Sequence, residues 1–208
     1  MGSRVGALKR RFEWQAGTGT FAGTGRSMLF ARNFFRYPKM LGTPIPSPRA
    51  LINEVLGRVN WREARVLVEY GPGVGDFTGE MLARMRSDAR LLALETNADF
   101  VRYLKDSLPD PRLHVTHASA GEVGNLLSRS GSPGADYVIS GIPFSTIPAD
   151  AREEILGATC EALQPRGEFL AYQYSRRVLP SLSKIFGHVR GEFRWLGFLP
   201  IWLFHCVP

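Results

Sequence analysis

Short apolar runs alternate with amphipathic stretches along most of the chain, from residue 47 to residue 174. Apolar runs bounded by turn residues predict buried strands at 65–70, 91–94, 113–116, 137–140 and 168–172. Apolar residues at helical spacing predict helices at 77–86, 98–108, 120–128 and 148–163. Ser47-Pro48, an N-cap followed by a first-turn proline, predicts one more helix before them. This alternation predicts an α/β fold with a parallel sheet covered on both faces.

The pattern changes after Tyr174. A short helix is predicted at 178–186, followed by two apolar strands at 191–196 and 201–206. The residues between these strands include glycine and proline, which favour a turn. The chain therefore is expected to end in a hairpin, and it contains no internal repeat.

The N-terminal segment has a different pattern. Glycine and threonine dominate residues 17–25 and predict a linker. Ser27 as N-cap and Pro38 as stop predict a helix at 27–37. Its aromatic residues and its basic residues fall on different faces, as in a helix that lies in a membrane interface. An ordinary amphipathic helix docked on its own domain would show the same pattern.

Charge separates this segment from the rest of the chain. The 208 residues include 26 Lys and Arg against 19 Asp and Glu. Residues 1–50 hold nine of the basic side chains and only one acidic one, so residues 51–208 hold 26 − 9 = 17 basic and 19 − 1 = 18 acidic side chains. We therefore expect a basic arm at 1–46 and a nearly neutral domain at 47–208. Such an arm favours a polyanionic partner, either nucleic acid or an anionic membrane surface, although a solubilising arm remains an alternative.

Composition excludes a globally disordered chain and argues against a disulfide framework, a zinc site and a membrane-spanning helix. The chain is 44% hydrophobic and 22% charged, which is enough to form a full core. Cys160 and Cys206 lie far apart, as is typical of a reducing cytoplasm, and the four histidines show no zinc-binding spacing, so no metal is expected. The longest uncharged run, 195–207, is short for a membrane span and contains Pro200.

The most specific motif runs from Glu69 to Gly75, where a buried strand ends in a glycine loop that opens a helix. The third glycine follows the second by two positions, unlike the dinucleotide fingerprint, and no Gly-Lys-Ser/Thr follows, unlike a P-loop. Glu69 would repel a pyrophosphate and instead suits a cationic ligand such as the amino group of S-adenosylmethionine. Glu95, at the end of the next strand, suits ribose hydroxyls.

These residues resemble the cofactor-binding half of class I S-adenosylmethionine-dependent methyltransferases, over roughly residues 48–175. The resemblance implies a Rossmann-like, seven-stranded, mostly parallel sheet with an antiparallel strand from a C-terminal hairpin. It implies S-adenosylmethionine as the cofactor. The implied cofactor-binding residues are Glu69, Tyr70, Gly71, Pro72, Gly73, Gly75, Phe77, Thr78, Glu95, Thr96, Ala118, Ser119 and Ser140. One departure is that 117–120 replaces the family's Gly-Asp-Ala, so adenine is expected to meet backbone groups and the Ser119 hydroxyl.

A second motif, Ser-Gly-Ile-Pro-Phe-Ser at 140–145, follows the fourth predicted strand. Adenine and glutamine amine methyltransferases carry Asn or Asp where this chain has Gly141. The string resembles the Ser-Gly-Leu-Pro-Phe-Ser of bacterial phospholipid N-methyltransferases. Residues 36–39, 45–49 and 172–174 are also similar to elements of that family.

This second resemblance implies N-methylation of the phosphatidylethanolamine headgroup towards phosphatidylcholine. Aromatic rings would surround the methylated amine through cation–π attraction, with Tyr172 as a further candidate ring. The implied catalytic residues are Tyr70, Ser140, Gly141, Pro143, Phe144 and Tyr174. The implied cations for the lipid phosphate are Lys39, Arg49 and Arg177, with Arg176 as a further candidate.

We expect a cytoplasmic protein that associates peripherally with an anionic membrane surface through residues 1–39. The main alternative is an rRNA adenine N-dimethyltransferase, favoured by the basic arm and opposed by Gly141. A methyltransferase acting on a small-molecule amine or an ornithine lipid, and a lipid-binding protein without catalysis, are further alternatives. The sequence leaves the number of methyl transfers and the oligomeric state open.

Overall fold

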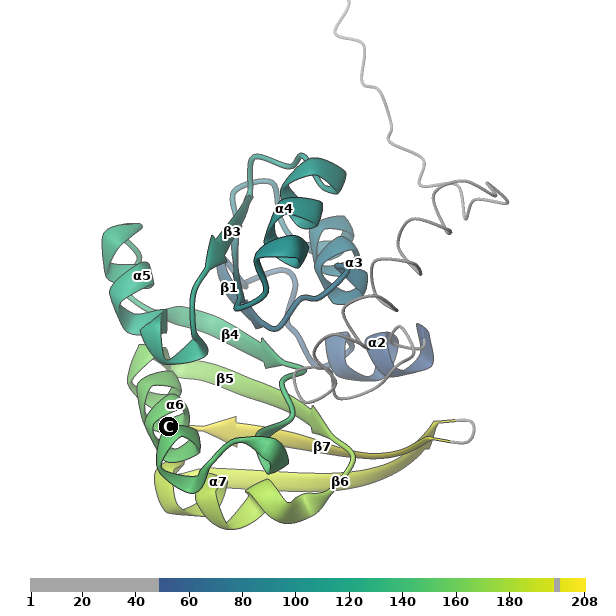
Figure 1. The fold of residues 1–208 in the computed structure, drawn as a ribbon, viewed down its shortest axis with the longest axis vertical. Coiled ribbons are helices and arrows are strands. Elements are labelled where there is room, and N and C mark those ends of the chain that lie inside the picture. The colour runs from purple at the N-terminus through teal and green to yellow at the C-terminus, as the bar shows by residue number, and fades with distance from the viewer. Residues whose placement is uncertain (1–48, 197–198) are drawn as a thin grey trace, which may run out of the picture.

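A computed structural model describes residues 49–196 and 199–208, which form a seven-stranded sheet covered by helices on both faces (Figure 1). The predictions made for the arm and for Lys39 lie outside these residues. The strand order is β3-β2-β1-β4-β5-β7-β6, and β7 runs antiparallel to both of its neighbours. The strands are β1 (Val66–Tyr70), β2 (Arg90–Glu95), β3 (Leu113–His117), β4 (Ala135–Ser140), β5 (Leu163–Gln173), β6 (His188–Leu196) and β7 (Leu199–Val207).

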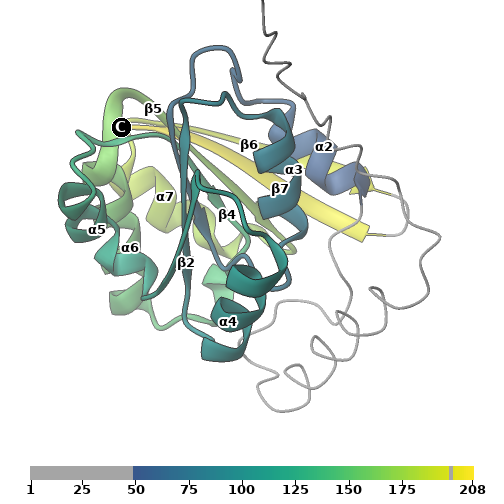
Figure 2. The ribbon, with the colours of Figure 1, turned by 90° about the horizontal axis from the view of Figure 1, so that it is seen from above.

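Six α-helices in the described residues cover the two faces of this sheet, three on each (Figure 2). One face carries α2 (Arg49–Leu56), α3 (Asp76–Arg84) and α4 (Ala98–Ser107). The other carries α5 (Val123–Arg129), α6 (Ala149–Ala162) and α7 (Leu179–Ile185). Short 3-10 turns precede α5, α6 and α7, at η1 (Ala120–Glu122), η2 (Phe144–Thr146) and η3 (Arg176–Val178).

The central strand β1 shows why the strand sequences are almost continuously apolar. Leu67 packs into the core beneath α2 and α3, whereas Val68 and Tyr70 pack into the core beneath α5, α6 and α7. Side chains alternate between the faces of a strand, so a strand covered on both sides needs apolar residues at successive positions. Glu69 interrupts this run with a buried carboxyl group.

The predicted fold class is confirmed, with two local corrections. The helix predicted at 120–128 is a 3-10 turn followed by α5, because the Ser119 and Glu122 side chains form a capping box at residue 119. The second strand of the hairpin was predicted to begin at residue 201. It begins two residues earlier, because β7 starts at Leu199 and Pro200 pairs with Trp195. Proline is tolerated there because it lies at the start of its strand.

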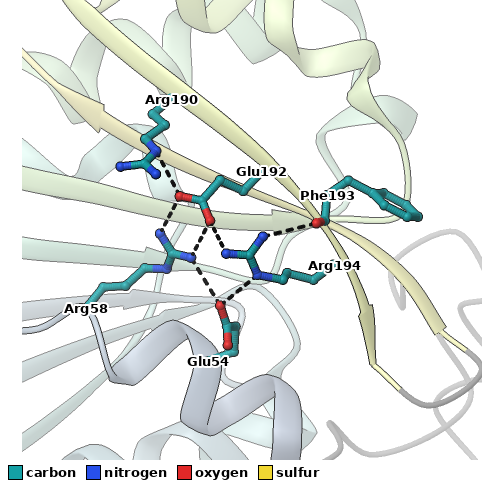
Figure 3. Close-up of polar contacts among 6 residues, drawn as sticks. All are labelled: Glu54, Arg58, Arg190, Glu192, Phe193 and Arg194. Atoms are coloured by element: carbon teal, nitrogen blue, oxygen red, sulfur yellow. Dashed lines mark hydrogen bonds and ion pairs between the residues drawn. The ribbon is translucent and has the colours of Figure 1, made fainter.

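An ion-pair cluster ties α2 and the residues after it to the edge strand β6 (Figure 3). Arg58 donates to both carboxylate oxygens of Glu192, over 3.2 and 3.0 Å, and also to Glu54. Arg194 donates to Glu54 over 3.1 Å and to Glu192. The hydrogen bond from Arg58 holds the pKa of Glu192 at about 2. The cluster therefore stays charged at neutral pH and fixes the packing of β6 against the segment that carries Glu54.

Candidate active site

The glycine loop after β1 is built from three left-handed residues, Gly71, Gly73 and Gly75, with φ of 68°, 56° and 83°. A Cβ atom at residue 71 would lie 2.8 Å from the Ile142 side chain, and one at residue 75 would lie 2.6 Å from Leu104. A Cβ atom at residue 73 would have no described atom within 4 Å. The outer glycines therefore serve packing, whereas Gly73 leaves open space into which a ligand can approach the backbone.

Glu69 lies on the face of β1 that packs against α3, directly before this loop. Its side chain is almost fully buried and accepts a hydrogen bond of 2.7 Å from the Thr78 hydroxyl. Burial raises the pKa of the Glu69 carboxyl to about 8, with smaller contributions from Glu95 and Asp76. The group therefore retains a proton at neutral pH and gains from a cationic partner.

Glu95, at the end of β2, contacts the same loop from the neighbouring strand. Its carboxylate accepts from the backbone N–H of Gly73 over 3.1 Å and from that of Asn97 over 2.8 Å. Burial also raises the pKa of Glu95. A carboxylate has about four lone-pair sites, so these two bonds leave capacity for hydroxyl donors. The predicted ribose acceptor thus also positions the loop.

The residues around these two carboxylates fit S-adenosylmethionine. Glu69 and Glu95 stand at the carboxyl ends of adjacent strands, the usual place for ligands in open α/β sheets. Glu69 suits an ammonium group, Glu95 suits a ribose diol, and the open space at Gly73 lets a ligand approach the backbone. Phe77 and Thr78, in the first turn of α3, are buried behind the loop.

The predicted adenine contacts lie beside Glu95 at the ends of β2 and β3. The Ala118 backbone N–H donates to the Glu95 carbonyl oxygen over 3.2 Å. The Ser119 hydroxyl accepts from the Gly121 backbone N–H over 3.3 Å. Thr96 is exposed, and its carbonyl oxygen lies 2.9 Å from His117 Nε2. Ser119 therefore has a structural role as a cap, and its predicted contact with adenine stays a prediction.

The second motif forms a loop after β4 that Gln173 holds in place. The buried Gln173 side chain accepts from the Phe144 backbone N–H over 3.1 Å and donates to the Ile142 carbonyl oxygen over 2.9 Å. It also donates to the Tyr172 carbonyl oxygen over 2.7 Å. The sequence did not predict a role for Gln173, although an amide directly after an apolar strand was the available signal.

Gly141 is required by its neighbour rather than by its backbone conformation. A Cβ atom at residue 141 would overlap the hydroxyl and the adjacent ring carbon of Tyr172. The Tyr172 ring stacks on Phe77, with ring centroids 4.9 Å apart and planes 10° apart. The Tyr172 hydroxyl therefore occupies the space that an Asn or Asp side chain at residue 141 would need.

The rings of two predicted aromatic residues point into the core and do not face the ligand side of this edge. Tyr70 and Phe144 are completely buried in the core beneath α6. The Tyr70 hydroxyl lies 3.1 Å from Thr159 Oγ1, and the Phe144 ring packs edge-on against Phe169. Burial raises the pKa of Tyr70 well above its ordinary value. This placement corrects the predicted aromatic surround, because the alternation of β1 directs Tyr70 away from the Glu69 face.

The remaining predicted residues are more dispersed. Ser140 is fully buried, and its hydroxyl has no hydrogen-bond partner in the described part of the chain. Tyr174 is 41% exposed, just beyond β5. Arg49 and Arg177 are exposed on α2 and η3, which belong to opposite faces of the sheet, so the structure does not bring these two predicted phosphate ligands together.

The described residues contain no group of three side chains suited to hold a metal ion. Among the same residues, no helix combines the length and apolarity needed to cross a membrane.

Comparison with known proteins adds to this geometry. No family model matches the chain. An ornithine lipid N-methyltransferase from Singulisphaera acidiphila is 28% identical over 142 residues, which are 68% of this chain and 74% of that protein.

Solved structures show the same fold at low sequence identity. A precorrin-6y C5,15-methyltransferase from Geobacter metallireducens is 15% identical with a TM-score of 0.61, over 80% of this chain and 92% of that one. A SAM-dependent O-methyltransferase from Thermotoga maritima is 13% identical with a TM-score of 0.60, over 86% and 71%. The predicted resemblance and fold class are therefore confirmed, and the predicted enzyme class and S-adenosylmethionine cofactor agree with these comparisons.

Proposed function

We propose that this chain is an S-adenosylmethionine-dependent N-methyltransferase that acts on the primary amine of a membrane lipid, with phosphatidylethanolamine as the first candidate. The observation that carries the proposal is the pairing of Gly141 with Tyr172. A planar base amine is conjugated and needs an Asn or Asp acceptor, and the Tyr172 hydroxyl excludes such a side chain. An aliphatic amine is a good nucleophile once deprotonated and needs only an oriented hydrogen bond.

The cofactor would be held by residues at the ends of β1 and β2. Glu69 binds its ammonium group, Glu95 its ribose hydroxyls, and the backbone around Gly73 lies against it. When bound, S-adenosylmethionine supplies an electrophilic methyl group. Because the Glu69 carboxyl retains its proton in the buried, ligand-free site, cofactor binding includes loss of that proton and formation of a charged pair.

The chain's own part in methyl transfer is to orient a neutral amine. The Tyr172 hydroxyl accepts a hydrogen bond from the amine N–H and directs the nitrogen lone pair at the methyl carbon. The cofactor held by Glu69 and Glu95 would supply the methyl carbon to this nitrogen and would retain the electron pair of the broken C–S bond on its sulfur. The amine then loses a proton to water. Gln173 keeps the loop at 141–144 in register with Tyr172 through its three hydrogen bonds.

A lipid substrate is supported by the motif at 140–145 and by the curated relative, which is an ornithine lipid N-methyltransferase. That relative makes ornithine lipid the second candidate. Both lipids present an aliphatic amine on an apolar anchor, but only phosphatidylethanolamine carries a phosphate. The exposed Arg177 therefore matters for one candidate and not for the other.

The test measures label from methyl-labelled S-adenosylmethionine on vesicles that contain either phosphatidylethanolamine or ornithine lipid. We expect faster labelling of phosphatidylethanolamine, and we expect Arg177→Ala to slow that reaction alone. Arg102→Ala is the matched control, because Arg102 is an exposed arginine on α4. Labelling of ornithine lipid only would identify ornithine lipid, and not phosphatidylethanolamine, as the substrate. Absence of label on both lipids would refute it.

A further inference from the structure

The described residues contain three large hydrophobic side chains that are exposed, and all three lie near the β6–β7 hairpin. Trp195 is 63% exposed, Phe193 is 46% exposed, and Tyr174 is 41% exposed at the end of β5. Isolated exposed aromatics are common on protein surfaces, whereas a cluster marks an interaction site.

The cluster continues into the sheet as a ladder of rings. Phe193 lies opposite Trp202 in the β6–β7 register, with ring centroids 5.4 Å apart, and it lies 6.2 Å from Trp195. Trp202 stacks on the buried Phe204 at 6.3 Å. The exposed rings are therefore anchored on the core, so their position is fixed by packing. We call Phe193, Trp195 and Trp202 the hairpin aromatics.

The ion-pair cluster on the other face of β6 explains why these rings point outward. Arg190, Glu192 and Arg194 alternate with Phe193 and Trp195 along the strand. Their charges are engaged on the face towards Glu54 and Arg58, and the Phe193 ring points away from that cluster (Figure 3). Alternation along the strand then presents the hairpin aromatics on the opposite face.

Cations stand beside the aromatic face. The Arg176 guanidinium lies over the Trp202 ring, 5.9 Å from its centroid, and Arg177 follows it in η3. Both arginines are exposed, and neither forms an ion pair with a carboxylate in the described part of the chain. Tryptophan beside arginine is typical of the membrane interface, where rings enter the headgroup region and guanidinium groups meet lipid phosphates.

The hairpin is rigidly connected to the candidate active site. Trp202 pairs with Gln173 in the β5–β7 register, and the Gln173 side chain holds the loop at 141–144. One strand pairing thus separates the aromatic ladder from the residue that positions the substrate loop. A surface that seats the hairpin on a bilayer would set the distance from the site to the headgroups.

We propose that the hairpin aromatics, with Arg176, form a second membrane-docking surface that inserts at the phospholipid interface and turns the Gly141 edge towards the headgroups. This proposal rests on the proposed lipid substrate. It assigns docking to the sheet itself, in addition to the predicted basic arm.

The experiment measures binding of the full chain to vesicles of equimolar phosphatidylethanolamine and phosphatidylglycerol at high salt. Each alanine variant removes one ring that would be buried in the membrane interface. We therefore expect Trp195→Ala and Phe193→Ala each to weaken partitioning of the protein into the vesicles about tenfold. Trp195→Phe keeps a ring and should bind like the wild type. Arg102→Ala changes an exposed residue on α4 and should have no effect.

A second readout reports insertion directly. The chain has four tryptophans, so Trp14→Phe with Trp61→Phe leaves only Trp195 and Trp202. We expect brominated lipid to quench their fluorescence. Unchanged vesicle binding of Trp195→Ala together with absent quenching would overturn the proposal. A change from dimer to monomer in Trp195→Ala, with vesicle binding intact, would also overturn it. That result would assign the surface to a second copy of the chain.

The proposed function and the proposed docking surface can be refuted independently of each other. Vesicle binding through Trp195 without any lipid labelling would overturn the proposed function and leave the docking surface standing. Lipid labelling, with normal vesicle binding of Trp195→Ala and no quenching by brominated lipid, would overturn the docking surface and leave the proposed function standing.

Discussion

At the scale of single residues, the Tyr172 side chain fills the space that any side chain at residue 141 would need. The Tyr172 ring is held by its stack on Phe77, and the hydroxyl oxygen at its tip moves only with the ring. A methyl group at residue 141 would overlap this oxygen and the adjacent ring carbon, so it would displace the stacked ring. A side chain at residue 141 is therefore expected to affect both catalysis and stability.

This pair gives the first prediction. Tyr172→Phe keeps the stack and removes one hydrogen bond, so kcat for lipid methylation should fall about tenfold while cofactor affinity is unchanged. Gly141→Ala should lower kcat by a similar factor or more and should also lower the melting temperature, because its methyl group displaces the Tyr172 ring. Steady-state kinetics and calorimetry check both variants. Full activity in Tyr172→Phe would remove the hydroxyl from the mechanism.

Glu69 gives a prediction about pH. The pKa of its carboxyl is about 8 in the folded, ligand-free protein, against an ordinary value of 4.5. Between these values the folded state holds a proton that the unfolded state lacks, so stability falls as pH rises from about 4.5 and levels off above about 8. Glu69→Gln should flatten this decline in melting temperature. Equal pH slopes for wild type and variant would contradict the assignment.

Glu95 gives a third prediction, on cofactor affinity. Glu95→Ala removes charged acceptors for the ribose and should weaken S-adenosylmethionine binding by ~1.5–3 kcal/mol. Glu95→Gln keeps one acceptor oxygen for the Gly73 N–H and should lose less. Isothermal calorimetry measures both variants. Unchanged affinity in Glu95→Ala would refute the ribose assignment.

At the scale of helices and strands, the sequence predicted the elements well, because strands covered on both faces leave a strong apolar pattern. The sequence did not predict which face of the sheet each aromatic side chain at a strand end would occupy. Tyr70 seemed available for substrate, yet the alternation of β1 places its ring beneath α6. Gln173 was missed because its role depends on the pairing of β5 with β4, which brings residues 142–144 within its reach.

The arm remains a prediction at this scale, since residues 1–46 lie outside the described part. Deletion of residues 1–39 removes eight of the nine basic residues found in 1–50. Each basic residue near an anionic bilayer contributes about 1 kcal/mol. We therefore expect the salt-sensitive part of vesicle binding to disappear and cofactor binding to persist. Equal cosedimentation of intact and truncated protein at low salt would show that the arm is not the membrane anchor.

At the scale of the whole molecule, the candidate site is assembled from the ends of four adjacent strands. β2 and β1 supply Glu95 and Glu69, while β4 and β5 supply Gly141 and Tyr172. The sequence predicted the cofactor half of this site because glycine loops and strand-end carboxylates are local signals. The substrate half depends on contacts between residues that are far apart in sequence, so only its motif at 140–145 was recognisable.

The proposed substrate of this edge is an aliphatic lipid amine and not a nucleic acid base. The most direct test is a competition in one reaction, with methyl-labelled S-adenosylmethionine, phosphatidylethanolamine vesicles and ribosomal RNA present together. After phase extraction, we expect label in the organic phase, and we expect Tyr172→Phe to reduce it. Label in the RNA, with none in the lipid, would contradict it.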